Sequence, residues 1–163
     1  ETFPANMDLD EVPVFIAKNK AQAVHEKIKL GYPQHINKHI VAADTIVVLE
    51  GNILGKPANK VEAIASLSAL SGKTHRVITG VVLIYNGKEY TFSETTLVTF
   101  NLLTLDQIEY YVENYKPYDK AGGYAIQEWI GVVGIQSIEG DFYNVMGLPV
   151  SKLLQKIKQL EVN

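Results

Sequence analysis

The stretch that decides the fold is THRVITGVVLIYNGKEYTFSETTLVTF, from Thr74 to Phe100. It consists of two runs rich in β-branched and aromatic residues, separated by the pair Asn86-Gly87. Asn-Gly is a preferred pair for a two-residue hairpin turn because both turn positions need a positive φ. The stretch therefore predicts an antiparallel β-hairpin, around which the remaining elements are arranged.

The segments outside the hairpin alternate between helical and strand patterns. Apolar residues at helical spacing predict a helix from Val12 to Leu30, and the apolar run from His39 to Leu49 predicts a strand buried on both faces. Two further helices are expected, one capped by Asn59 that runs to Leu70 and one from Thr104 to about Tyr115. Short strands are expected around Tyr124 and Val132. A C-terminal helix is expected from Pro149, with one apolar face formed by Val150, Leu153, Leu154, Ile157 and Leu160. This order predicts a single α/β (α+β) domain, residues 1–163, with a mixed, largely antiparallel sheet.

The composition narrows the class of protein. The 163 residues are 47% hydrophobic, enough for a proper core in one domain. The 15 basic and 18 acidic residues give a net charge of -3, which argues against a general nucleic-acid binder with a basic stripe. The chain has no cysteine, so thiolate chemistry is excluded and a cytoplasmic location is expected. No apolar run approaches the roughly 20 residues of a membrane span, and a membrane partner is not expected.

Asp44 is the residue that fits a purely structural interpretation least. It lies inside VAADTIVVLEGNILGKP, Val41 to Pro57, with four apolar residues following Asp44-Thr45 in the strand. An ionised carboxylate is costly to bury unless it is paired or binds a metal. The alternative is that Asp44 caps a turn at a strand end, but the apolar run that continues beyond Thr45 favours a functional acid.

Three lysines and a glutamine join Asp44 as candidates. Lys56 lies in Gly55-Lys56-Pro57, and Lys20 lies on the first expected helix. In YDKAGGYAIQ, Lys120 precedes two glycines whose backbone N–H groups could approach phosphate, and Gln127 offers a donor and an acceptor to a base edge. A solvated surface lysine is an equal alternative for Lys56 and, taken alone, the favoured one for Lys20. Lys120 and the glycines could likewise form an ordinary turn with a solvated lysine.

Two further acids precede the last expected helix. Glu139 and Asp141 lie in IEGDFYNVMGLPV. They could bind a metal, or they could shape the turn, as aspartate often does.

Five segments together resemble the Maf family of nucleoside triphosphate pyrophosphatases. They are, in order, FIAKNKA, AADTIVVLEGNILGKP, LSGKTHRVITGV, DKAGGYAIQ and IEGDFYNVMGLPV, and they span the chain from about Phe15 to Pro149. The resemblance implies an elongated fold related to inosine-triphosphate pyrophosphatases, with a mixed sheet flanked by helices and a cleft between two lobes. It also implies cleavage of a nucleoside triphosphate between the α and β phosphates with Mg²⁺ or Mn²⁺, and a homodimer.

The resemblance also assigns roles to residues. Asp44 matches the proton acceptor, and Lys20 and Lys56 match active-site lysines. Lys120 matches a plausible phosphate contact, and Glu1 would join Asp44 as a metal ligand. Thr45 and Gln127 match the specificity residues of the branch that acts on dTTP and UTP, whereas the branch acting on 7-methyl-GTP usually has Asp-Gln in place of Asp44-Thr45.

Side-chain alternation along a strand adds a geometric expectation. It points Thr45 to the side of the sheet opposite Asp44. The specificity role of Thr45 therefore rests on the resemblance, not on a shared face.

One departure from the family pattern concerns phosphate binding. The family begins with a strand and a Ser-x-Ser-Pro-Arg-Arg loop that holds phosphate, and nothing like it occurs in this sequence, whose single arginine is Arg76. We therefore expect a truncated chain that binds triphosphate poorly on its own. Two alternatives to dTTP/UTP hydrolysis stay open. They are a non-catalytic regulator that inhibits septum formation, and a house-cleaning enzyme for modified nucleotides.

Overall fold

The long hairpin forms the centre of the molecule, as the sequence predicts. The computed structural model describes residues 2–162, and within that range the chain forms five strands and six α-helices. The strands are β1 (Ile40–Leu49), β2 (Asn52–Leu54), β3 (Thr74–Tyr85), β4 (Lys88–Phe100) and β5 (Ile135–Glu139). The helices are α1 (Val12–Gly31), α2 (Lys60–Leu70), α3 (Leu105–Tyr115), α4 (Trp129–Gly134), α5 (Phe142–Val145) and α6 (Val150–Glu161), with short 3₁₀ turns η1 (Pro33–His35) and η2 (Ala121–Gly123).

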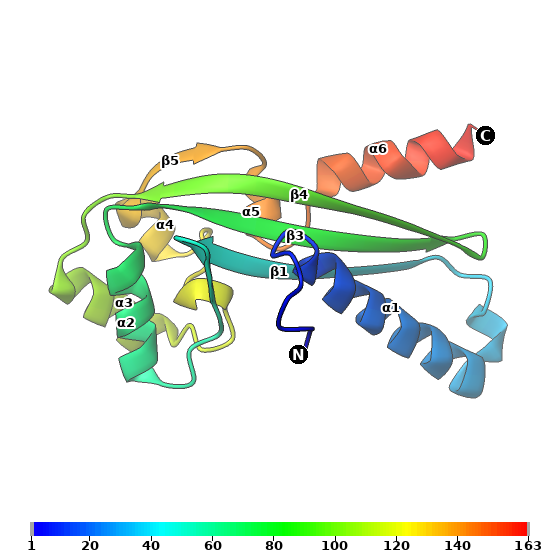
Figure 1. Cartoon of the computed structure of the whole chain (residues 1–163), viewed down its shortest axis with the longest axis horizontal. Coiled ribbons are helices and arrows are strands. Elements are labelled where there is room, and N and C mark those ends of the chain that lie inside the picture. The colour runs from blue at the N-terminus through cyan, green and yellow to red at the C-terminus, as the bar shows by residue number, and fades with distance from the viewer. Residues whose placement is uncertain (1, 163) are drawn as a thin grey trace.

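The strands form one sheet in the order β2-β1-β3-β4-β5. Every strand pairing among the described residues is antiparallel, so the expectation of a mixed sheet is wrong. Asn86 and Gly87 both have positive φ at the β3–β4 turn, as a two-residue hairpin requires. Figure 1 shows an elongated molecule in which β3 and β4 run nearly its whole length.

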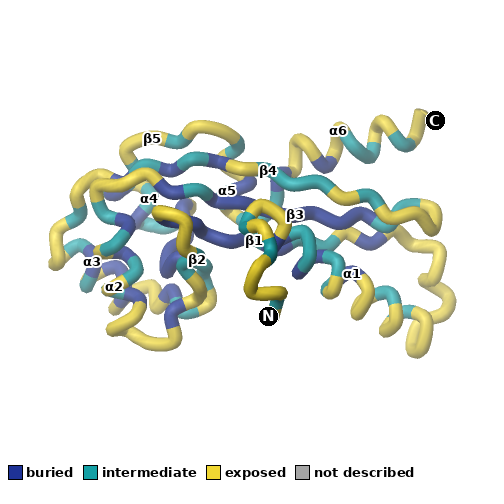
Figure 2. Tube along the Cα trace, in the orientation of Figure 1, coloured by how far each residue is buried: buried dark blue, intermediate teal, exposed yellow. Residues whose placement is uncertain are grey.

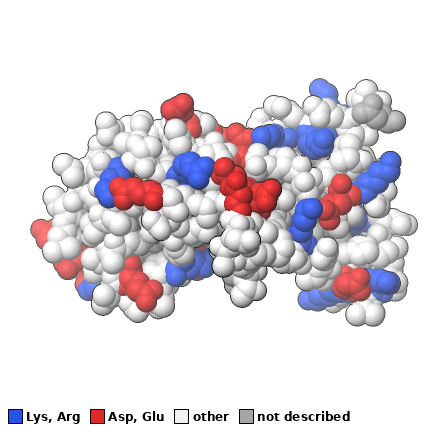
Figure 3. Space-filling view, in the orientation of Figure 1, with Lys and Arg blue, Asp and Glu red and all other residues white. Residues whose placement is uncertain are grey.

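The two ends of the molecule are built differently. At one end α2, α3 and α4 cover the sheet, and at the other α1 lies along one face and α6 lies near β4 on the other (Figure 1). Figure 2 shows β1 and β3 as the most continuously buried strands, whereas the hairpin tip and much of α6 are exposed. Lysines and acidic side chains alternate across the face drawn in Figure 3 without a stripe of one sign.

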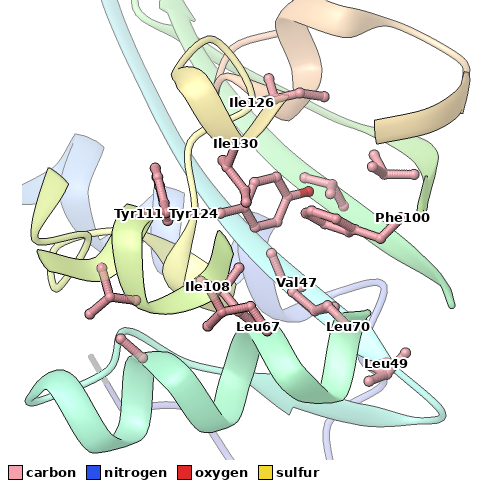
Figure 4. Packing of buried hydrophobic residues seen from close by; sticks show 14 residues of the cluster. Val47, Leu49, Leu67, Leu70, Phe100, Ile108, Tyr111, Tyr124, Ile126 and Ile130 are labelled. Carbon is pink, nitrogen blue, oxygen red and sulfur yellow. The ribbon is translucent and has the colours of Figure 1, made fainter. Parts of the chain in front are cut away.

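The core beneath the helical end is large and aromatic. Figure 4 shows Tyr124 and Phe100 packed with aliphatic side chains that come from the sheet, α2 and α3. The two rings meet edge to face with their centroids 5.1 Å apart. This core holds the segment that follows α3 against the sheet, and that segment later forms one wall of the candidate site.

Helix α1 packs unusually close to the sheet because of a glycine in β3. A Cβ added to Gly80 would lie 2.2 Å from the backbone nitrogen of Val14, so only glycine leaves room for the helix there. Ala17 and Ala21 are fully buried on the same side of the helix. Lys20 lies between them in the sequence, and the close approach of α1 brings it to β1.

Two predictions about the second half of the chain need correction. Val132 lies in α4, and Tyr124 belongs to an extended segment without a strand partner among residues 2–162; the paired strand is Ile135–Glu139. A Cβ at Gly131 would lie 1.7 Å from the carbonyl oxygen of Ile126, so the chain folds back on itself at α4 instead of extending. In α6, only Leu153 of the predicted apolar face is buried, while Leu154 is exposed.

Candidate active site

A cavity of about 250 Å³ lies at the open edge of β1. Strand β2 pairs only with Val47–Leu49 of β1, so within residues 2–162 the earlier part of β1 has no strand neighbour on that side. The cavity brings together six of the residues singled out from the sequence, namely Lys20, Asp44, Thr45, Lys56, Lys120 and Gln127. Glu1, which the resemblance also singles out, lies outside the described residues.

Asp44 and Thr45 point to opposite faces of the sheet, as strand alternation predicts. Asp44 meets Lys20 on α1, whereas Thr45 meets Thr79 on the other face. Both nevertheless line the same cavity, because the cavity lies around the open edge of the strand and reaches both faces. The expected obstacle to a joint role for the two residues is therefore absent.

The carboxylate of Asp44 is nearly buried and bonded to a lysine. The side chain of Asp44 is 8% exposed, and Nζ of Lys20 donates to its Oδ1 at 2.5 Å. The lysine remains 40% exposed, so its ammonium group lies at the boundary between the protein and the cavity. The ion pair fixes the position of this carboxylate at the cavity, and a positioned carboxylate is a suitable proton acceptor.

On the other face, Thr45 begins a chain of buried hydrogen bonds. Its Oγ1 lies 2.8 Å from Oγ1 of Thr79, which in turn donates to the backbone oxygen of Asn144 at 3.1 Å. Asn144 is fully buried, and its Nδ2 donates to the backbone oxygens of Val77 and Glu94 and to a threonine hydroxyl.

The two acids before the last helix have different positions. Oδ1 of Asp141 accepts from the backbone N–H groups of Tyr143 and Asn144, at 2.7 and 3.1 Å, and so caps α5. Of the two interpretations of Asp141, the turn-shaping one matches these contacts. Glu139 is exposed on β5 and does not line the cavity.

The opposite wall of the cavity is the segment from Asp119 to Gln127. The N–H of Gly122 donates to the oxygen of Gly55 at 3.1 Å, and Oγ of Ser66 donates to the oxygen of Gly122 at 2.8 Å. Gly122 has a positive φ and faces Val47 so closely that a Cβ would approach that side chain to 3.0 Å. These contacts place Lys120 and Lys56 at the same cavity.

The hydroxyl groups of two tyrosines tether this segment to neighbouring parts of the protein. The hydroxyl of Tyr111 accepts from the N–H of Ala125 at 3.1 Å and donates to Glu128 at 2.5 Å. The hydroxyl of Tyr124 lies 2.6 Å from Nε2 of His75. Burial lowers the pKa of His75 to about 4, so the ring is neutral at pH 7.

Sequence inspection missed one acid of the cavity. Asp119 lines it beside Lys120, whose Nζ lies 3.0 Å from Oδ2 of Asp119. This hydrogen bond holds the pKa of Asp119 below its usual value, with a smaller contribution from the charge of Lys56. The signal was present in YDKAGG, where the aspartate directly precedes the lysine.

The cavity offers oxygen ligands to a divalent cation. Asp44 and Asp119 both line it, while residues 2–162 contain no group of three or more acidic or histidine side chains placed to hold a metal. Mg²⁺ is usually bound by one or two carboxylates and completes its shell with water and substrate phosphates. The two carboxylates fit that mode.

No helix within residues 2–162 is long and apolar enough to cross a membrane.

Comparison with known proteins matches these features to a family. The model of the family described as Maf-like protein matches residues 1–160. A relative from Porphyromonas gingivalis is 48% identical over 158 residues, which cover 97% of this chain and 77% of the relative. One from Bacteroides fragilis is 47% identical over 160 residues, covering 98% and 80%. One from Cytophaga hutchinsonii is 47% identical over 160 residues, covering 98% and 70%. All three relatives are named dTTP/UTP pyrophosphatase. The chain belongs to the Maf family.

Proposed function

We propose that this protein is a nucleoside triphosphate pyrophosphatase that hydrolyses dTTP and UTP to the monophosphate and pyrophosphate. The observation that carries the proposal is the composition of one cavity. It combines a nearly buried carboxylate, three lysines, and a hydroxyl and an amide suited to a base edge. The names of the three relatives support the choice of substrate.

The lysines supply the charge that a triphosphate needs. Lys20, Lys56 and Lys120 reach the cavity from α1, from the segment after β2 and from the segment after α3. Cations fixed in place before the reaction stabilise negative charge that develops on a leaving pyrophosphate. Because they come from three separate parts of the chain, their convergence depends on the tertiary fold.

Asp44 is the group that accepts the proton of the attacking water in this proposal. The strand fixes its backbone, and Lys20 holds its carboxylate at the cavity. Such positioned proton transfer typically contributes 10²- to 10⁴-fold to rate. Asp44 and Asp119 would hold Mg²⁺ or Mn²⁺, which, when bound, neutralises phosphate charge and lowers the pKa of coordinated water.

Several sequence-based expectations stay predictions. They are the homodimer, the cytoplasmic location and the metal role of Glu1. The relation of the fold to inosine-triphosphate pyrophosphatases, with the two ends of the molecule as two lobes around a cleft, is another. The arginine-bearing loop of the family does not occur in this sequence. This affects the experiment, because arginine is a strong ligand of phosphate.

The test is release of pyrophosphate from a panel of nucleoside triphosphates with Mg²⁺ or Mn²⁺. It is run on the 163-residue chain and on the same chain extended at residue 1 by the Ser-x-Ser-Pro-Arg-Arg segment of the family. We expect dTTP and UTP to be hydrolysed faster than CTP and the purine nucleotides. If neither folded form hydrolyses any nucleotide, the catalytic proposal is wrong and the non-catalytic regulator takes its place. Faster turnover of a modified pyrimidine nucleotide would identify the house-cleaning role.

A further inference from the structure

The hydroxyl of Thr45 lies at the cavity end of a buried hydrogen-bond chain. The donors and acceptors in that chain determine which hydroxyl donates in each bond. Thr79 is fully buried, and its Oγ1 contacts two oxygens, Oγ1 of Thr45 at 2.8 Å and the backbone oxygen of Asn144 at 3.1 Å. A hydroxyl has one hydrogen to donate, and a carbonyl oxygen can only accept. The hydrogen of Thr79 therefore belongs to its contact with Asn144.

This assignment fixes the direction of the remaining bond. If Thr79 instead donated to Thr45, its oxygen would face the carbonyl oxygen of Asn144 in a buried site with no hydrogen between them, and buried polar contacts of that kind are costly. Thr45 must then donate to Thr79. With its single hydrogen used inside the protein, the Thr45 oxygen presents only lone pairs to the cavity.

The far end of the chain is rigid enough to maintain this direction. The backbone of Asn144 is held by the carboxylate of Asp141, and its side-chain amide bonds to strands β3 and β4. Thr45 is half-buried and lines the cavity, and Gly147, which lines it too, adjoins the threonine oxygen: a Cβ added there would lie in van der Waals contact with it, at 3.7 Å. The acceptor is thus fixed from behind and accessible in front.

We propose that Thr79 is a positioning residue that makes the Thr45 hydroxyl an obligatory hydrogen-bond acceptor, and that this acceptor selects bases with a ring N–H donor. Uracil and thymine carry such a donor at N3, whereas N3 of cytosine is an acceptor and would meet the threonine oxygen lone pair to lone pair. A site discriminates strongly when the wrong ligand leaves its polar groups unpaired. The inference rests on the proposed function, since it explains how the same cavity would distinguish UTP from CTP.

The experiment removes the hydrogen bond without removing Thr45. Thr79→Val keeps the shape of the side chain but has no hydroxyl, so the hydrogen of Thr45 becomes free to point into the cavity. Thr79→Ser restores the hydroxyl. The matched control is Thr99→Val, because Thr74 and Thr99 form a similar cross-strand pair, also 2.8 Å apart, at residues that do not line the cavity.

The readout is the ratio of kcat/KM for UTP to that for CTP, together with the ratio of the affinities for UMP and CMP measured by calorimetry. We expect Thr79→Val to reduce both ratios about tenfold, the value of one hydrogen bond at about 1.4 kcal/mol. Thr79→Ser should restore most of the discrimination, and Thr99→Val should leave it unchanged. A merely structural role of Thr79 would lower the rates for both nucleotides together and leave their ratio unaltered.

The outcomes separate this inference from the proposed function. Hydrolysis of UTP with an unchanged ratio in Thr79→Val overturns the role of Thr79 and leaves the activity standing. Absence of turnover, with a wild-type preference for UMP that Thr79→Val removes, overturns the activity and supports the role of Thr79. A wild-type protein that binds UMP and CMP equally overturns the inference.

Discussion

The two walls of the cavity are built in opposite ways. The strand wall, Asp44 and Thr45 of β1, is held in the sheet, and each side chain is bonded to a neighbouring element. The loop wall consists of Asp119, Lys120 and Gln127, which reach the cavity from a segment outside the sheet and are more exposed. Groups that must be placed within a fraction of an ångström benefit from a strand. A lysine that only offsets phosphate charge, such as Lys120, tolerates an exposed loop.

The loop wall is nevertheless not free of support. Its backbone is bonded to Gly55 and Ser66, and Tyr124 continues below it into the aromatic core. The comparison therefore teaches that the loop wall is fixed mainly through its backbone, whereas the strand wall is fixed through both its backbone and its side chains. Four substitutions test this difference, from the largest expected effect to the smallest.

Asp44→Asn should have the largest effect. The amide cannot accept a proton from water, so we expect kcat to fall at least about 100-fold while the fold is retained. Steady-state pyrophosphate release and circular dichroism measure the two quantities. The matched change in the loop wall, Asp119→Asn, should cost less than about tenfold. If Asp44→Asn retains a tenth or more of the activity, Asp44 is not the proton acceptor.

Gly80→Ala should come next, through the layer behind the strand wall. The new methyl group would overlap the backbone of Pro13 and Val14, so α1 must shift, at a cost of about 1–3 kcal/mol in the free energy of unfolding. Lys20 would move with the helix, and activity should fall as well. Gly31→Ala, which has open space around it, serves as the control in urea unfolding. Equal stabilities for the two variants would contradict the close packing of α1.

Acidification should weaken the support of the loop wall. The pKa of His75 is lowered by burial to about 4, against 6.5 for an ordinary histidine. The unfolded chain therefore binds more protons between these values, and stability present above pH 6.5 is lost as the pH falls towards 4. From pH 7 to pH 5 the loss is about 2 kcal/mol.

Urea unfolding of the wild type and of His75→Gln at the two pH values measures this contribution. The amide of the variant does not titrate in this range, so its stability should fall less between pH 7 and pH 5. Equal losses in the two proteins would show that His75 is not the source.

Gln127→Ala should have the smallest effect. The amide is exposed, so losing its hydrogen bond should change the preference for UTP over CTP by about threefold and slow catalysis less. Gln136→Ala, an exposed glutamine on β5 away from the cavity, should change neither quantity. A rate loss for Gln127→Ala as large as that of Asp44→Asn would show that the loop wall takes part in the chemistry.

Most elements of the first two thirds of the chain could be predicted because their signals are local. The turn at Asn86-Gly87, the cap at Asn59 and the capping box from Thr104 to Gln107 all occur as predicted. The region around Val132 could not be predicted in the same way. Its β-rich composition is overridden by tight packing at Gly131, which is a contact within the folded chain.

The sequence by itself determined the hairpin, the four longer helices α1, α2, α3 and α6, and most of the cavity residues, because turn chemistry, periodicity and motif order are properties of the chain. Tertiary structure alone decided that Asp44 and Thr45 share a cavity despite their opposite faces, since that depends on where β2 stops pairing with β1. It also decided the direction of the Thr45 hydrogen bond. That direction is set by a backbone carbonyl 99 positions further along the chain, at Asn144, and hydrogen bonds between such distant residues exist only once the chain has folded.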